Sequence, residues 1–117
     1  MKYIALIYSE PQELPPLGSP EFEAAMAEWT KVNKAFADGG VMVAGEALEP
    51  PTTATRVEVR GGRTATMDGP FAETKEQLGG FYLFDCKDLD EAIKYAAMIP
   101  VERFGTIEVR PIANLGG

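Results

Sequence analysis

Residues 2–9 read KYIALIYS, and this stretch decides the class of fold. It is short, rich in residues that favour strands, and apolar on both faces of an extended chain. The two alternating faces are Tyr3, Ala5 and Ile7, and Ile4, Leu6 and Tyr8. Residues 79–86 (GGFYLFDC) have the same character. Because a strand with two apolar faces is covered on both sides, we expect these strands to lie inside a covered sheet.

A long helix is predicted between these strands. Ser19 and Pro20 are typical of a helix start, because serine caps the first turn and proline suits the first helical position. Apolar side chains then recur every three or four residues until about Asp38, where Gly39 is predicted as a left-handed C-cap. These side chains are Phe22, Met26, Trp29, Val32 and Phe36. The stripe indicates a helix that packs on the sheet.

Turn signals and caps predict the remaining elements. Asp88 and Glu91 resemble a capping box and predict a second helix, which Pro100 ends. Two alternating runs around Gly61-Gly62 predict a β-hairpin. The predicted β segments beyond the two already described are residues 41–48, 55–60, 63–67 and 106–112.

The order of these elements predicts the architecture. Two strand–helix–strand halves separated by a hairpin, in a single domain of residues 1–117, predict an α+β fold: a ferredoxin-like sandwich with an extra β-hairpin. Two helices cover only one face of a sheet, although the strands are apolar on both. We therefore expect a homodimer that closes two sheets into a dimeric α+β barrel. A closed monomeric barrel would also hide both faces.

Composition narrows the classes of function. The net charge of −7, without a basic run, argues against a nucleic-acid partner and an anionic membrane surface. The single cysteine excludes an internal disulfide, and the absence of histidine excludes histidine-ligated metals, histidine bases and serine–histidine triads. No apolar run approaches the roughly 20 residues of a membrane span, and no acidic cluster has the spacing of a calcium loop. We expect a soluble, cytoplasmic protein without metal or cofactor.

The stretch DGPFAETKEQLGGFYLFD (68–85) resembles the signature of the DGPF-domain proteins of the YCII-related family. MKYIALIY (1–8), GEALEPP (45–51) and TIEVRPI (106–112) extend the resemblance over nearly the whole chain. It implies a dimeric α+β barrel with a pocket in each half, genes beside extracytoplasmic-function sigma factors and, for most members, no assigned reaction. Some related barrels catalyse isomerisation or elimination on small aromatic-derived acids. Members commonly carry a histidine where this chain has Phe104. The histidine–aspartate pair of better-known relatives is not transferable, because this chain has no histidine.

Asp68 is the candidate catalytic residue. An aspartate before Gly-Pro often caps its own turn, in which Gly69 supplies permissive dihedral angles. The alternative is a carboxylate at the mouth of a pocket that acts as a general base. We expect Asp68 and Arg110 to line one pocket.

Arg110 and Glu108 are candidate ligand-binding residues. If Ile107 and Val109 face the helices, then Glu108 and Arg110 face the barrel interior. An arginine in that position needs an anionic partner, because an unpaired buried charge is costly. One alternative is an ion pair with Glu108 of the partner subunit, with Glu46 or with Asp68, and the other is a guanidinium fork that holds a carboxylate ligand.

Glu76, Tyr8 and Tyr82 complete the candidate site. The charged run at Glu73, Lys75 and Glu76 is typical of a solvated surface, and the alternative is a lid with Glu76 or Lys75 reaching inward. The two tyrosines could place hydroxyls in the pocket, although such tyrosines are more often core residues with one satisfied hydroxyl. Cys86, without a histidine partner, is predicted as a small buried hydrophobic residue.

Three functions follow from these features. The first is a dimer that binds a small polar or acidic molecule in a pocket. The second is a cofactor-free lyase or isomerase that uses a carboxylate base. The third is a non-catalytic regulatory module associated with a sigma factor, which only the family resemblance implies.

Overall fold

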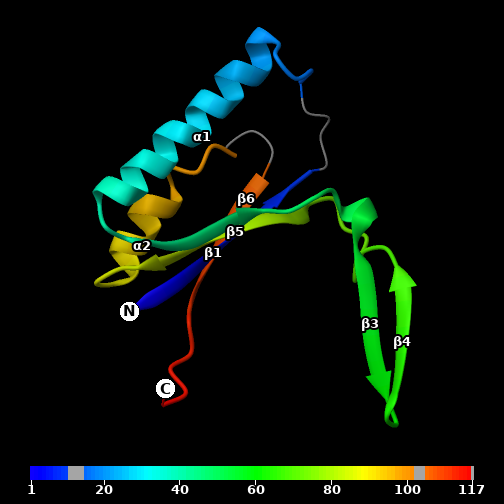
Figure 1. Cartoon of the computed structure of the whole chain (residues 1–117). Coiled ribbons are helices and arrows are strands. Elements are labelled where there is room, and N and C mark those ends of the chain that lie inside the picture. The colour runs from blue at the N-terminus through cyan, green and yellow to red at the C-terminus, as the bar shows by residue number, and fades with distance from the viewer. Residues whose placement is uncertain (11–14, 102–104, 117) are drawn as a thin grey trace.

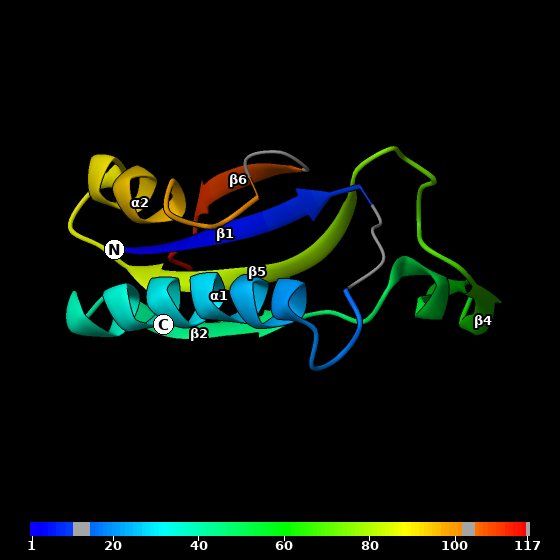
Figure 2. The ribbon, with the colours of Figure 1, turned by 90° about the horizontal axis from the view of Figure 1, so that it is seen from above.

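The protein has a four-stranded antiparallel sheet with two helices on one face (Figures 1 and 2). A computed structural model describes residues 1–10, 15–101 and 105–116, so Phe104 lies outside the described residues. The strand order is β2-β5-β1-β6, which suits the predicted ferredoxin-like arrangement. The mixed α+β class is therefore confirmed. The elements of this layer are β1 (Lys2–Ser9), α1 (Pro20–Asp38), β2 (Met42–Ala47), β5 (Gln77–Asp85), α2 (Leu89–Ala96) and β6 (Gly105–Pro111).

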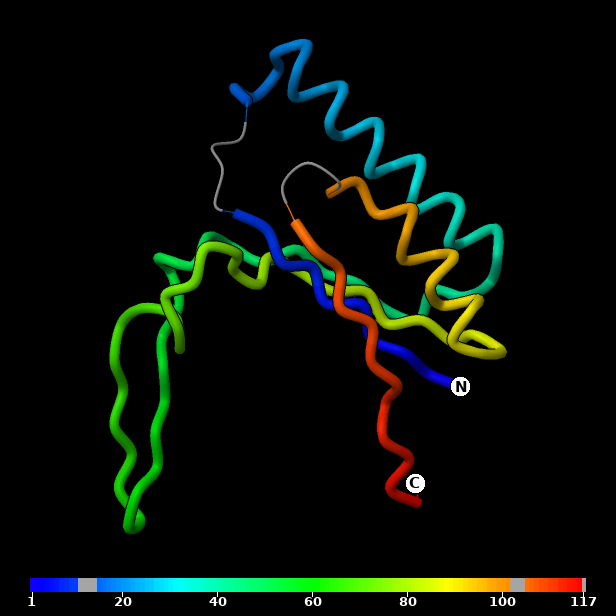
Figure 3. Tube along the Cα trace, turned by 180° about the vertical axis from the view of Figure 1, so that it is seen from behind, coloured from blue at the N-terminus to red at the C-terminus, as the bar shows by residue number. Residues whose placement is uncertain are grey.

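A separate two-stranded sheet projects from one end of this layer. It consists of β3 (Thr55–Arg60) and β4 (Arg63–Asp68), after the short 3-10 helix η1 (Pro51–Thr53). Gly61 and Gly62 both have positive φ, 56° and 77°, as the tight turn between the strands requires. Figures 1 and 3 show the hairpin running past the sheet on the side away from the helices. It makes a steep angle with the sheet.

Both helices begin as their sequences predict. The Ser19 hydroxyl accepts a hydrogen bond from the amide of Phe22 at 3.2 Å. The Asp88 carboxylate accepts from the amide of Glu91 at 2.9 Å, and the Glu91 carboxylate accepts from the amide of Lys87 at 3.1 Å. These contacts satisfy amide groups that have no partner inside the helix. Both predicted N-terminal caps are confirmed.

The end of α1 differs from the prediction by one residue. Gly39 has right-handed dihedral angles, with φ of −76° and ψ of −10°, and its amide still donates to Ala35. Gly40 has the positive φ, 67°. The helical hydrogen bonding continues through Gly39, so the left-handed residue that ends the helix is Gly40 rather than Gly39.

The core lies between the helices and the sheet, and Phe36 is at its centre. The ring of Phe36 makes edge-to-face contacts with Tyr82, Phe84 and Tyr95, with ring centroids 4.9 to 5.9 Å apart. The predicted apolar stripe of α1 is buried only in part: Val32 and Phe36 are buried, whereas Met26 is 38% exposed. Figure 1 gives the reason, since the first turns of α1 rise away from the sheet.

β5 begins two residues before its predicted start and contains a β-bulge near that end. β5 begins at Gln77 rather than residue 79, and its register against β1 shifts between Ile7 and Tyr8. The paired partners of these two residues are Gly80 and Leu78, so Gly79 is the extra residue. This agrees with the bulge that glycines inside a strand indicate.

Candidate functional site

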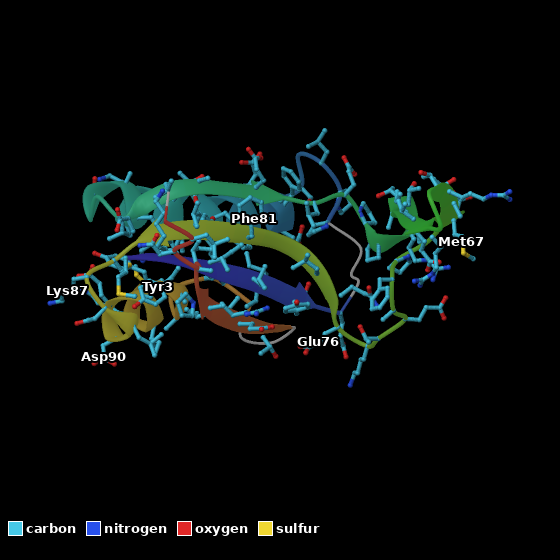
Figure 4. The ribbon with its side chains drawn as sticks, turned by 90° about the horizontal axis from the view of Figure 1, so that it is seen from below. Tyr3, Met67, Glu76, Phe81, Lys87 and Asp90 are labelled. Carbon is cyan, nitrogen blue, oxygen red and sulfur yellow. The ribbon has the colours of Figure 1, made fainter. Side chains whose placement is uncertain are left out.

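The face of the sheet away from the helices has an apolar centre. Ile4 pairs with Leu83, and Leu6 pairs with Phe81, so these four partly exposed side chains share one face. We call this surface the open face, and Figure 4 looks onto it, with Phe81 near its middle. The other face of β1 presents Tyr3, Ala5 and Ile7 to the core. The prediction that the strands are apolar on both faces is confirmed.

Charged side chains lie beside this apolar centre. Along β6, Ile107 and Val109 pack against the core, and exposed Glu108 and Arg110 alternate with them. Glu108 lies opposite Leu6, and Arg110 lies opposite Ile4, so both belong to the open face, as predicted. Glu46 of β2 lies opposite Phe81 on the other side. Within the described part of the chain, none of these three charged groups forms an ion pair.

An open hollow of about 800 Å³ lies at the end of the sheet where β1 ends and β6 begins. Tyr8 and Thr106 are neighbours across β1 and β6 within it. The Thr106 hydroxyl donates to the Glu76 carboxylate, 3.2 Å from both oxygens. Lys75 instead forms an exposed ion pair with Glu10 at 3.1 Å. The residues that line the hollow are Tyr8, Glu10, Thr74, Lys75, Glu76, Thr106, Ile107 and Glu108.

The structure brings together Tyr8, Glu76 and Glu108 in the hollow, and Arg110 extends the same face along β6. The alternative in which Glu76 reaches inward therefore fits its half-buried position. Thr106 and Glu10 complete the hollow, although the sequence did not single them out. The signal for Thr106 was present, because it precedes Glu108 and Arg110 on the same alternating face.

Tyr82 lies on the opposite face from this hollow. It is buried against the helices, pairs with Ala5, and donates its hydroxyl hydrogen bond to Asn33 at 2.6 Å. Burial raises the pKa of its phenol. Tyr82 is thus a core residue with one satisfied hydroxyl rather than a group on the open face.

Asp68 and Arg110 lie on different sheets and do not meet within one chain. Asp68 is the exposed last residue of β4, whereas Arg110 lies opposite Ile4, near the start of β1. Asp68 does not cap its turn among the described residues; the turn is held by the Gly69 amide, which donates to Ala54 at 2.8 Å. Gly69 has a φ of 102°, which agrees with the permissive dihedral angles predicted for it.

Cys86 belongs to the core rather than to the site. Its side chain is 2% exposed, and burial, with a smaller contribution from Glu91, raises the pKa of the thiol. A buried thiol with a raised pKa is a poor nucleophile, as predicted. Across the described residues, no three acidic or cysteine side chains are grouped so that they could hold a metal ion.

Comparison with known proteins identifies the family. The model of the YCII-related domain matches residues 1–115. The chain belongs to the YCII-related domain family. This YCII-related chain is also 38% identical over 115 residues to the uncharacterized protein R00369 of Rhizobium meliloti (strain 1021), an alignment that covers 97% of the chain and 93% of that protein. Neither helix of the YCII-related chain, in the part that the structure describes, is long and apolar enough to cross a bilayer.

Proposed function

We propose that this YCII-related protein is a homodimer that binds a small polar or acidic molecule between two facing sheets. In this proposal two ferredoxin-like halves bring their open faces together into a dimeric α+β barrel. The observation that carries the proposal is the open face itself. It combines four apolar side chains with Glu46, Glu108 and Arg110 at its sides, which form no ion pair among the residues that the structure describes.

The apolar centre supports the second copy as the cover of this face. Two sheets that pack face to face stand about 10 Å apart, which at the centre of the interface leaves room only for their side chains. Facing copies would remove Ile4, Leu6, Phe81 and Leu83 from water, worth roughly 25 cal/mol for each Å² of apolar surface buried. Polar groups at the ends of such an interface stay accessible, so the hollow remains open to a ligand.

The charges of the face favour a ligand with both donors and an acid group. Tyr8, Glu76 and Glu108 offer a hydroxyl and two carboxylates, which accept hydrogen bonds from hydroxyl or amino groups. Arg110, two residues along the strand from Glu108, offers a fork of donors that suits a carboxylate. Thr106 and Arg110 are four residues apart on one strand, about 13 Å, which is the scale of a small molecule.

Carboxylate catalysis is the second candidate function, and Glu76 is the observation that favours it. The Thr106 hydroxyl orients the Glu76 carboxylate within a hollow that also contains Tyr8. A positioned carboxylate can take a proton from a bound substrate, and Tyr8 can donate a hydrogen bond to the anion that forms. Asp68 enters this scheme only if a second copy carries it to the open face.

A thermal-shift screen of small hydroxy acids and amino acids tests the proposal, together with sedimentation of the free protein at micromolar concentration. We expect a dimer, and a stabilising acid whose effect is lost in Arg110→Met. Arg63→Met, which removes another exposed arginine at the hairpin tip, is the matched control and should keep the effect. A monomer, or an acid that stabilises Arg110→Met as much as the wild type, would contradict the proposal. Loss of turnover in Glu76→Gln with retained binding would identify catalysis.

A further inference from the structure

Among the described residues, the β3–β4 hairpin forms a sheet of its own, with no further strand beside it. Arg56 is the one half-buried residue of its two strands; the others are exposed, including Val57 at 61% and Val59 at 64%. Phe71, in the loop that follows, is 88% exposed. An isolated two-stranded sheet is marginally stable in water. A hairpin this regular, with exposed valines on one face and arginines on the other, therefore requires a surface that the described part of the chain does not offer.

The position of the hairpin indicates where that surface lies. The hairpin runs past the open face on the side away from the helices (Figures 1 and 3). Its six-residue strands are about 20 Å long, roughly twice the spacing of two packed sheets. The radius of gyration, 16.5 Å, exceeds the roughly 13 Å of a compact chain of this length. A second copy seated on the open face would therefore lie alongside the hairpin.

Arg56 carries an unmet hydrogen-bond donor on this hairpin. Its Nε is buried without a partner among the described residues. One terminal nitrogen, Nη2, donates to the sulfur of Met67 at 3.3 Å. A thioether is a weak acceptor, and a buried guanidinium donor without an anion is costly. The arginine thus lacks the acceptor that a carboxylate would supply.

The distribution of charge identifies that acceptor. Three of the five arginines of the chain, Arg56, Arg60 and Arg63, share one face of the hairpin. Arg60 and Arg63 lie directly opposite each other at the exposed tip, where water screens their charges and an ion pair contributes little. The chain as a whole carries −7. Glu46 and Glu108, on the face that the proposed dimer covers, are carboxylates without ion pairs in the described part of the chain.

We infer that the β3–β4 hairpin is an arm that lies against a second copy of the chain, and that Arg56 binds Glu46 or Glu108 of that copy. This inference rests on the proposed dimer and adds a contact between the two copies that stabilises it. The guanidinium fork makes charge-assisted hydrogen bonds to the carboxylate of the second copy. Val57 and Val59 lie on the opposite face of the hairpin from Arg56, so in this inference the arginine face is turned toward the second copy. Because the arm comes from the other copy, each ligand site is bordered by residues of both chains.

Arg56→Met tests the inference through the dissociation constant of the dimer, measured by sedimentation equilibrium. We expect the constant to rise by about tenfold or more, because a desolvated charge pair at an interface is lost. Arg60→Met is the matched control from the same face of the same strand, and it should change the constant by less than about threefold. Circular dichroism of both variants checks that the sheet remains folded.

Charge exchange then identifies the carboxylate. Arg56→Glu should weaken the dimer further, and either Glu46→Arg or Glu108→Arg should restore it when combined with Arg56→Glu. Amide exchange of residues 55–68 in the wild type should also slow as the protein concentration rises. A wild-type monomer would overturn the proposed dimer and the arm together. A wild-type dimer that Arg56→Met leaves unchanged, that Arg60→Met weakens equally, or that neither exchange restores would overturn the arm alone.

Discussion

Two phenylalanines on one strand separate the stability of the single chain from that of the proposed dimer. Phe84 and Phe81 both lie on β5, but they point to opposite faces. Phe84 is fully buried against the helices, with the ring of Phe36 at 4.9 Å and that of Tyr82 at 5.8 Å. Phe81 lies on the open face opposite Leu6. Replacing each with alanine removes the same atoms from different environments.

Phe84→Ala should lower the free energy of unfolding by about 4–5 kcal/mol. Truncation of a buried phenylalanine costs about 3–5 kcal/mol, and a lost aromatic pair adds roughly 0.5–1.5 kcal/mol, which puts the expected cost in the upper part of that range. A domain of this size has a total stability of about 5–15 kcal/mol, so this single change removes a large part of it. The loss belongs to the core of one chain and should be the same at every protein concentration.

Phe81→Ala should act mainly through the dimer. The wild type should unfold at higher urea concentration as the protein concentration rises, because each tenfold in concentration adds about 1.4 kcal/mol to a dimer. Phe81→Ala should lose most of that dependence and differ little from the wild type at the lowest concentration. The assay is urea unfolding followed by circular dichroism at two protein concentrations about 100-fold apart, roughly 0.5 and 50 μM. A wild type without concentration dependence, or a Phe81→Ala loss equal to that of Phe84→Ala at both concentrations, would refute this reasoning.

Three further predictions follow from the core and the sheet. Burial raises the pKa of Tyr82 in the folded protein. The stability that this shift contributes is complete below the ordinary pKa of tyrosine and is lost as pH rises through the folded-state pKa. Between about pH 9 and 11, the free energy of unfolding of Tyr82→Phe should therefore fall less than that of the wild type. Gly80→Ala should lower the free energy of unfolding in urea by about 1–3 kcal/mol, because the added Cβ would lie 2.8 Å from the Glu46 carbonyl oxygen. In the control Gly79→Ala, the added Cβ would lie 3.7 Å from its nearest neighbour, and the loss should be less than about 1 kcal/mol. Cys86 should react with iodoacetamide only as fast as the protein opens, and fully in denaturant; rapid labelling of the native protein would contradict its burial.

The elements were predictable because each has local signals. Ser19 and Asp88 cap helices through contacts that span three residues, so the sequence contains all that those contacts need. The face of each β6 residue was also predictable, since the apolar set and the charged set alternate along one strand. The end of α1 was less predictable, because Gly39 and Gly40 can both adopt left-handed dihedral angles. Only the hydrogen bonding of the last turn decides which of the two does so.

The face of Tyr82 was not predictable for a different reason. β5 is apolar at consecutive positions, so alternation does not say which set of side chains meets the helices. The register does: Tyr82 pairs with Ala5 of the buried set, and Phe81 pairs with Leu6 of the open set. Each of these pairs joins residues more than 70 positions apart, so the pairing is a tertiary property. The direction of the hairpin also depends on tertiary structure. The sequence therefore could not show that Asp68 and Arg110 lie on different sheets.

Twofold symmetry sets how the proposed interface should be measured. In a dimer with a twofold axis, every contact between the copies occurs twice, because residue i of one copy meets residue j of the other and the reverse. Arg56→Met would therefore remove two identical contacts, and the change in the free energy of dimerisation is twice that of one arm. A mixed dimer of one wild-type and one variant chain keeps one arm. Its dissociation constant should accordingly lie at the geometric mean of the two pure dimers, once the statistical factor for mixing is included. A mixed dimer as weak as the pure variant would mean that the two arms act as a unit rather than independently.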